Sequence, residues 1–278
     1  MSNNNLNCNE FKLVSRKTKR TKSTNDIDCR FLIEPVASRN FDLEFSLKRI
    51  ETAKEELLTT DVYRSIVASL REGLNILHSS EVKEIVCFGL GRIGECMIAR
   101  YQLALLLCLR DLYNVKIIVY DPIFNENDHS ILSALDFSVL HNNIEGKYCI
   151  KEKNTTLFYL PHGPKQLTNN LLWANWGIQL SYCLIIANSF TKIIESNTKR
   201  HILENAQYLL NISPYITELA IVNSFKYFDI FNDTAIHIFP WENISLISQD
   251  FWDYHKEPKY TDSDIEFITN KIQTKLEL

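Results

Sequence analysis

The chain has 278 residues, of which 45% are hydrophobic and 23% charged, so it has enough apolar material for the core of one large domain. Its net charge of −4 argues against general attraction to nucleic acids or anionic membranes. Its seven cysteines form no CxxC pair, and no secretory signal is apparent, so we expect free thiols in a reducing compartment and no zinc knuckle. The longest apolar stretch, residues 176–187, is too short to span a bilayer.

Residues 1–40 are polar, Asn-rich at the start and without sustained periodicity, so we expect a disordered tail. The tail contains a basic cluster formed by Arg16, Lys17, Lys19, Arg20 and Lys22. This cluster is either a nuclear localisation signal or weak anionic contact, or simply a solvated segment that keeps the protein soluble. Nucleic-acid binding would rest on this tail alone.

Residues 41–80 are expected to form a helical extension of two amphipathic helices packed on the domain that follows. Apolar residues recur there mostly three or four positions apart: Leu47, Ile50, Leu57, Val62, Ile66, Leu70, Leu74 and Leu77. We interpret this stripe as core rather than as a groove for a partner.

From residue 81 to 262 the pattern alternates between strands and helices. The expected strands are 82–88, 115–120, 137–140, 157–160, 182–187 and 235–239, and the expected helices are 95–112, 129–135, 166–176 and 198–210. This alternation predicts an α/β fold, a Rossmann-like, doubly wound and mainly parallel sheet with helices on both faces. Residues 263–278 are expected to be a mobile tail.

A glycine-rich hexapeptide follows the first predicted strand and opens the next helix. It reads Gly89-Leu90-Gly91-Arg92-Ile93-Gly94, which is G-x-G-x-x-G in the context that gives the pattern meaning. The chain has only seven glycines, and three of them fall here. We therefore predict a ligand pocket in which Gly89 allows the tight turn, Gly91 the close approach of a phosphate or ribose, and Gly94 close packing of helix and strand. The alternative is a strand-to-helix turn with no ligand.

Three side chains near this loop are candidate ligand contacts. Asp121 ends the second strand, where a carboxylate can accept hydrogen bonds from ribose hydroxyls or can instead cap the turn before Pro122. His162 follows the fourth strand and is either a base or ligand contact, or a partner in a structural hydrogen bond. Arg92 either pairs with a phosphate or is a surface charge. The predicted ligand is of the adenine-nucleotide type, NAD(P) or S-adenosylmethionine.

The sequence contains none of the HExxH, G-x-S-x-G or G-x-x-x-x-G-K-[ST] motifs, and its histidines lack metal-ligand spacing. No catalytic residue or metal site can be assigned, which favours a protein that is not an enzyme.

Several blocks between residues 84 and 240 resemble the Sensitivity-to-Red-Light-Reduced family, the SRR-like proteins. The matching blocks are Gly89–Gly91, Ala99–Ala104, Val119–Pro122, Phe158-Tyr159, Pro161-His162, Asn170–Trp176, Asn188–Phe190, Phe231–Thr234, His237 and Phe239-Pro240. The Arg-Tyr-Gln-Leu-Ala and Leu-Leu-Trp-x-Asn-Trp blocks are the most specific. We expect Arg100, Gln102, Asn170, Asn175, Trp173 and Trp176 within them to have structural roles.

The resemblance implies a regulatory protein of the cytoplasm and nucleus, linked to circadian clock input, light signalling and haem biosynthesis. It supplies no catalytic residue and names no protein partner. The sequence departs from the family at Gly163, where a cysteine is expected after Pro-His, and the third loop glycine, Gly94, is not expected in every member. The alternative function is an enzyme that uses S-adenosylmethionine or NAD(P).

Overall fold

The computed structural model describes residues 41–150 and 155–260. The predictions made for the tails, 1–40 and 263–278, lie outside these residues. The five cysteines within the described residues, Cys87, Cys96, Cys108, Cys149 and Cys183, are free thiols.

The described residues form one seven-stranded sheet. Its strands are β1 (Val82–Phe88), β2 (Lys116–Tyr120), β3 (Ser138–Val139), β4 (Thr155–Tyr159), β5 (Cys183–Asn188), β6 (Thr217–Ala220) and β7 (Thr234–Ile238). Their order is β3-β2-β1-β4-β5-β7-β6. Strands β1 to β5 pair in parallel, whereas β7 runs antiparallel to both β5 and β6. The predicted mainly parallel α/β fold is confirmed.

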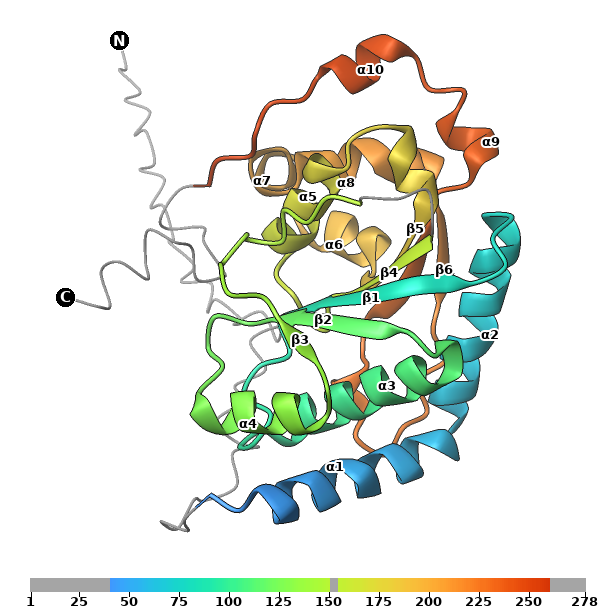
Figure 1. The fold of residues 1–278 in the computed structure, drawn as a ribbon. Coiled ribbons are helices and arrows are strands. Elements are labelled where there is room, and N and C mark those ends of the chain that lie inside the picture. The colour runs from blue at the N-terminus through green and yellow to red at the C-terminus, as the bar shows by residue number, and fades with distance from the viewer. Residues whose placement is uncertain (1–40, 151–154, 261–278) are drawn as a thin grey trace, which may run out of the picture.

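Helices cover both faces of this sheet (Figure 1). On one side lie α1 (Leu43–Leu58), α2 (Asp61–Ile76), α3 (Met97–Tyr113) and α4 (Glu126–Ala134), and on the other α5 (Lys165–Ala174), α6 (Phe190–Ser196), α7 (Lys199–Asn205) and α8 (Gln207–Ile212). Two short helices, α9 (Trp241–Ile244) and α10 (Gln249–Asp253), follow β7. Helix α1 packs on α3 and α4, outside the layer that contacts the sheet.

The central strand β1 shows why the sheet needs both helical layers. Ile85 and Cys87 belong to the buried cluster shared with α1, α2 and α3. Val86 and Phe88 point to the opposite face and belong to the cluster shared with α5 and α8. A parallel strand buried on both faces is a continuous apolar run, which is what the sequence showed.

The predicted pair of helices before the sheet is confirmed as α1 and α2. Asp42 caps α1 by accepting a 3.0 Å hydrogen bond from the backbone N–H of Phe45, and Thr60 caps α2 by accepting from that of Tyr63. Ile66 and other apolar residues of α2 lie in the same buried cluster as β1. The helical extension therefore shares the core of the sheet.

Three features on the β5 side of the sheet differ from the sequence prediction. The single helix expected over 198–210 is two helices, because the backbone leaves the helical region at Ala206, with φ −153° and ψ 43°. Helix α6 and strand β6 were not predicted. Both are short, and β6 is an edge strand with only partly buried residues, so neither has a strong periodic signal.

The carboxylate of Glu218 joins these two unpredicted elements. From β6, its Oε1 accepts a 2.5 Å hydrogen bond from Ser189 Oγ, and its Oε2 accepts from the backbone N–H of Thr191 at 3.1 Å. Ser189 is the residue that caps α6. Oε2 also lies 3.4 Å from Nε2 of the fully buried His237 on β7. Partial burial raises the pKa of Glu218, but the contacts with His237, Ser189 and Thr191 outweigh it and lower the pKa to about 2.

Gly73 of α2 gives the first testable prediction. A Cβ there would lie 2.9 Å from Leu184 Cδ2 and 3.3 Å from two side-chain atoms of Ile238, and both neighbours are fully buried. Helix propensity alone favours alanine over glycine by about 1 kcal/mol. We expect the opposite sign: Gly73→Ala lowers the free energy of unfolding by about 1 kcal/mol or more through overpacking, measured by urea denaturation. Asn75→Ala, at an exposed position of the same helix, is the control and should leave stability unchanged or raise it. A more stable Gly73→Ala protein would contradict the packing described here.

Glu218 should make the stability of the fold depend on pH in the acid range. The pKa of Glu218 is lower in the folded state than its ordinary 4.5, so its ionised form stabilises the fold. That contribution is complete above about pH 4.5 and is lost as the pH falls toward 2. Because the side chain is partly exposed, we expect Glu218→Gln to cost only about 1–2 kcal/mol at neutral pH. The difference from wild type should shrink between pH 4.5 and 2 in urea titrations. The prediction is contradicted if the difference in unfolding free energy between Glu218→Gln and wild type does not change with pH. It is also contradicted if the exposed control Glu72→Gln shows an equally large difference.

Candidate functional site

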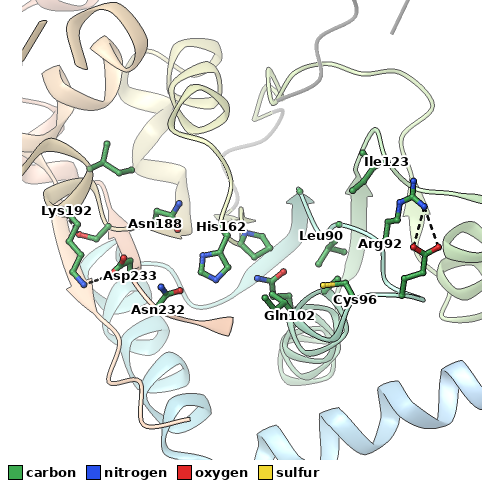
Figure 2. Close-up of a pocket in the computed structure, with 18 of the residues that line it drawn as sticks. Leu90, Arg92, Cys96, Gln102, Ile123, His162, Asn188, Lys192, Asn232 and Asp233 are labelled. Carbon is green, nitrogen blue, oxygen red and sulfur yellow. Dashed lines mark hydrogen bonds and ion pairs between the residues drawn. The ribbon is translucent and has the colours of Figure 1, made fainter. Parts of the chain in front are cut away.

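A cavity of about 580 Å³ opens at the carboxyl ends of β1, β4 and β5. In a doubly wound sheet this is the edge where ligands bind, beside the point at which the strand order reverses. The residues that line it include Gly89, Leu90, Gly91, Arg92, Glu95, Cys96, Gln102, Ile123, Pro161, His162, Asn188, Ser189, Lys192, Asn232 and Asp233. Figure 2 shows this cavity with side chains from all three strand ends around it.

The first two glycines of the loop have a backbone conformation that favours glycine. Gly89 has φ +83° and Gly91 has φ +75°. Gly94 differs, because it lies in a turn before α3, which begins at Met97 rather than at the predicted residue 95. A Cβ at Gly94 would be in ordinary contact with Asp128 and Ile131 of α4. The expectation that Gly94 lets helix and strand pack closely was therefore wrong.

Asp121 points at the glycine loop. Its Oδ2 accepts a 2.7 Å hydrogen bond from the backbone N–H of Gly91, and its Oδ1 accepts from that of Ile123 at 3.0 Å. The carboxylate is largely buried. Burial raises the pKa of Asp121, while the two backbone donors oppose the rise, and the nearby charge of Asp128 adds to it.

Asp128 holds the other end of the loop. Its Oδ1 accepts a 3.0 Å hydrogen bond from the backbone N–H of Gly94, and its Oδ2 accepts from that of Asn125 at 3.1 Å, within the capping box of α4. The N–H groups of both Gly91 and Gly94 are therefore bonded to carboxylates. An anion at this corner would meet two negative charges.

His162 lies in the turn after β4, at φ +49°, and lines the cavity. Its Nε2 is 2.9 Å from the backbone oxygen of Ile230, and Gln102 Nε2 lies 3.5 Å from the same oxygen. Because a carbonyl oxygen only accepts, Nε2 carries the proton. In the neutral ring Nδ1 is then a hydrogen-bond acceptor.

Charged side chains at the cavity are paired. Arg92 Nη1 is 3.4 Å from Glu95 Oε2, and Lys192 Nζ pairs with Asp233 Oδ1. Figure 2 shows Lys192 and Asp233 on one side of His162 and Arg92 on the other. Both pairs are substantially exposed, so each contributes little to stability and can exchange partners with a ligand.

Four of the six sequence-predicted site residues, Gly89, Gly91, Arg92 and His162, line this cavity. Asp121 lines a smaller cavity next to it, and Gly94 is absent from the lining of both. Their role in ligand binding stays a prediction.

Sequence reasoning did not propose Gln102, Asn188, Ser189, Lys192, Asn232 or Asp233 as site residues. For Asn188 and Ser189 the available signal was their position in the sequence, at the carboxyl end of the strand β5. Gln102 comes from α3, in which every residue from Ile98 to Leu109 is buried, so no periodic pattern showed the direction of its side chain.

The most specific family block around α5 has a structural role. Asn175 Nδ2 donates to the backbone oxygens of Tyr148 at 2.8 Å and Leu171 at 2.9 Å. The indole of Trp176 stacks on Phe251, with ring centroids 5.1 Å apart. These contacts tie α5 to the β3–β4 connection and to α10.

Across residues 41–150 and 155–260, no three His, Cys, Asp or Glu side chains are grouped as metal ligands. Within the same ranges no helix is long and apolar enough to cross a membrane.

Among solved structures, two of MtNAS align with this chain, one of a mutant and one in complex with MTA and tNA. Both are 12% identical, cover 71% of this chain and 73% of theirs, and have TM-scores of 0.37 and 0.36. This likeness is too weak to bear on the site.

Several proteins have a higher sequence identity to this chain than these two structures have. An SRR1-like protein of Mus musculus is 34% identical over 216 residues, which is 66% of this chain and 86% of the mouse protein. An SRR1-like protein of Drosophila melanogaster is 25% identical over 87% of this chain and 84% of its own length. The Arabidopsis thaliana protein SENSITIVITY TO RED LIGHT REDUCED 1 is 29% identical over 71% of this chain and 73% of its own. The SRR1 domain model matches residues 65–238. The chain belongs to the SRR1 family.

Proposed function

We propose that this SRR1-family protein is a ligand-responsive regulator. A small nucleotide-type molecule binds in the cavity at Gly89, Gly91 and His162, and the bound state is what partner proteins recognise. The processes that it regulates are clock input, light signalling and haem biosynthesis, as the family resemblance implies, in cytoplasm and nucleus. The name of the plant relative, which refers to red-light sensitivity, supports the light-signalling part.

The observation that carries this proposal is the position of the cavity. It lies where β1, β4 and β5 end, and it is bordered by two glycines with positive φ. This is the part of a doubly wound sheet at which nucleotide ligands are held. A volume of about 580 Å³ suits a ligand of that size.

Thermal unfolding with a ligand panel tests the binding step. NAD, NADP, S-adenosylmethionine, S-adenosylhomocysteine and ATP are added separately to the purified protein. At a concentration about 100 times its Kd, a ligand that binds only the folded state adds about 2.7 kcal/mol of stability, which raises the Tm by several degrees. We expect a rise with at least one adenosine compound. Unchanged melting with all five would remove the ligand from the proposal.

A pocket-blocking variant in cells tests the regulatory step. Gly91→Val strains a residue at φ +75° and fills the loop, and Ser196→Trp narrows the cavity from an exposed position. We expect both to lose the light or clock phenotype that the wild-type gene restores, whereas Glu195→Trp, next in sequence and outside the cavity lining, restores it. Protein abundance is measured in parallel. If folded Ser196→Trp fully restores the phenotype, the cavity is not required for regulation.

An enzyme that uses S-adenosylmethionine or NAD(P) is the second candidate, and His162 is the observation that favours it. A non-glycine residue held at φ +49° inside a cavity is a type of strain that clusters at functional sites. If a reaction occurs here, His162→Asn should lower its rate at least about tenfold while leaving ligand affinity within about threefold. The assay follows consumption of the stabilising ligand by mass spectrometry. Equal rates in the two proteins would exclude His162 as the base.

A further inference from the structure

A second cavity, of about 210 Å³, lies on the β2 side of the glycine loop. It is lined by Phe88, Gly89, Tyr120, Asp121, Pro122, Ile123, Asn143, Glu145, Gly146, Pro164 and Leu167. We call it the small cavity and the 580 Å³ one the large cavity. Gly89 and Ile123 line both, so the two meet at the carboxyl end of β1.

At the place where the two cavities meet, Gly89 contributes no side chain. Its φ is +83°, and a hypothetical Cβ there would have no atom within 4 Å beyond those of its two chain neighbours. Glycines elsewhere in the fold are crowded: a Cβ at Gly73 or Gly146 would approach neighbouring atoms to within 3.0 Å. A ligand can therefore cross over the backbone of Gly89 with one part on each side.

The walls of the small cavity suit a flat aromatic ring that carries a sugar. Phe88, Tyr120, Pro122 and Leu167 supply apolar surface, and the volume accommodates a bicyclic base. Asp121 and Glu145 are the two carboxylates in its lining, and Asp121 is the one that holds the glycine loop. Each of its oxygens already accepts one backbone N–H and retains a lone pair with which to accept from a ribose hydroxyl.

The group that crosses Gly89 meets negative charge. A dinucleotide places its diphosphate on the free N–H groups of this loop. In this protein the N–H groups of Gly91 and Gly94 are bonded to Asp121 and Asp128. A diphosphate on the N–H group of Gly91 would have to displace Asp121 or lie against it, which Coulomb repulsion opposes. Asp128 is buried and lines neither cavity, so it keeps the N–H group of Gly94 occupied. An uncharged or cationic linker avoids this conflict.

We propose that the two cavities together bind a purine nucleoside extended from its sugar by a linker that carries no phosphate, with the base in the small cavity and the extension in the large one. The extension ends among paired charges, Lys192 with Asp233, which can exchange with the ammonium and carboxylate of an amino acid. This inference rests on the proposed ligand-binding function and narrows its ligand class, favouring S-adenosyl compounds over NAD(P).

The test compares the full-length wild-type protein with three tryptophan variants by calorimetric titration. Pro122 lines only the small cavity, Ser196 lines only the large one, and Leu112, an exposed residue, lines neither. The ligands are adenosine, S-adenosylhomocysteine and NAD. Circular dichroism and thermal unfolding establish that each variant is folded.

We expect Pro122→Trp to weaken both adenosine and S-adenosylhomocysteine at least about tenfold. Ser196→Trp should weaken S-adenosylhomocysteine to the same degree and leave adenosine within about twofold, and Leu112→Trp should change neither. In the wild type, NAD should bind at least about tenfold more weakly than S-adenosylhomocysteine. If Pro122→Trp does not fold, Tyr120→Leu removes the ring surface instead and should weaken both nucleosides.

The titrations distinguish a failure of the proposed ligand-binding function from a failure of the proposed ligand class. If none of the three compounds binds the wild type, the proposed ligand-binding function falls, and this inference with it. If S-adenosylhomocysteine binds but its affinity survives changes at Pro122 and Tyr120, the base does not occupy the small cavity. If NAD binds as tightly as S-adenosylhomocysteine, the carboxylates do not exclude a diphosphate. In the last two outcomes ligand binding stands. The second outcome overturns the position of the base, and the third overturns the exclusion of phosphate from the linker.

Discussion

The hydrogen bond from the backbone N–H of Gly91 to the carboxylate of Asp121, at 2.7 Å, organises the edge of the sheet at which the candidate site lies. It joins the loop after β1 to the end of β2, so the two strand ends have a fixed separation. It also places a buried negative charge beside a loop whose glycines would otherwise attract phosphate. Asp128 repeats the arrangement at Gly94 from α4. This arrangement is the basis of our proposal that the glycine pattern here serves a ligand without a phosphate, because the N–H groups of Gly91 and Gly94 are already bonded to carboxylates.

The opposite wall of the large cavity depends on a different carboxylate. Glu218 of β6 binds the cap of α6 through Ser189 and lies against His237 of β7. Ser189 and Lys192 reach the cavity because they follow the carboxyl end of β5, and Asp233 reaches it because β7 runs antiparallel to β5 and therefore begins at the same edge. Each wall is held by one buried or half-buried acidic side chain that accepts several hydrogen bonds. His162 and Gln102, bonded to the backbone oxygen of Ile230, form the floor between the walls.

Part of the candidate site could be predicted from the sequence, because some of its residues directly follow the ends of strands. Gly89, Gly91 and His162 follow strands with clear apolar runs, and the carboxyl ends of parallel strands meet at one edge. Gln102, Asn232 and Asp233 were not predictable in this way. Gln102 is a polar residue on a helix with a buried face almost all round, and the other two precede an antiparallel strand whose place in the sheet the sequence does not specify. Asp121 was predicted as a ribose contact, and no pattern indicated that it also bonds to Gly91.

By itself, the sequence determined the fold class, the two N-terminal helices and the location of the glycine loop, because periodicity, strand length and glycine content are local properties of the chain. The family was identified differently, from the resemblance of specific sequence blocks, and the SRR1 domain model matches residues 65–238. Only the tertiary structure decided that β7 lies antiparallel between β5 and β6, that α3 begins at Met97, and that two cavities meet over Gly89. These features depend on contacts between residues far apart in sequence, from Ser189 with Glu218, 29 positions apart, to Leu184 with Ile238, 54 positions apart. Hydrogen bonds of that range leave no periodic trace in a single sequence.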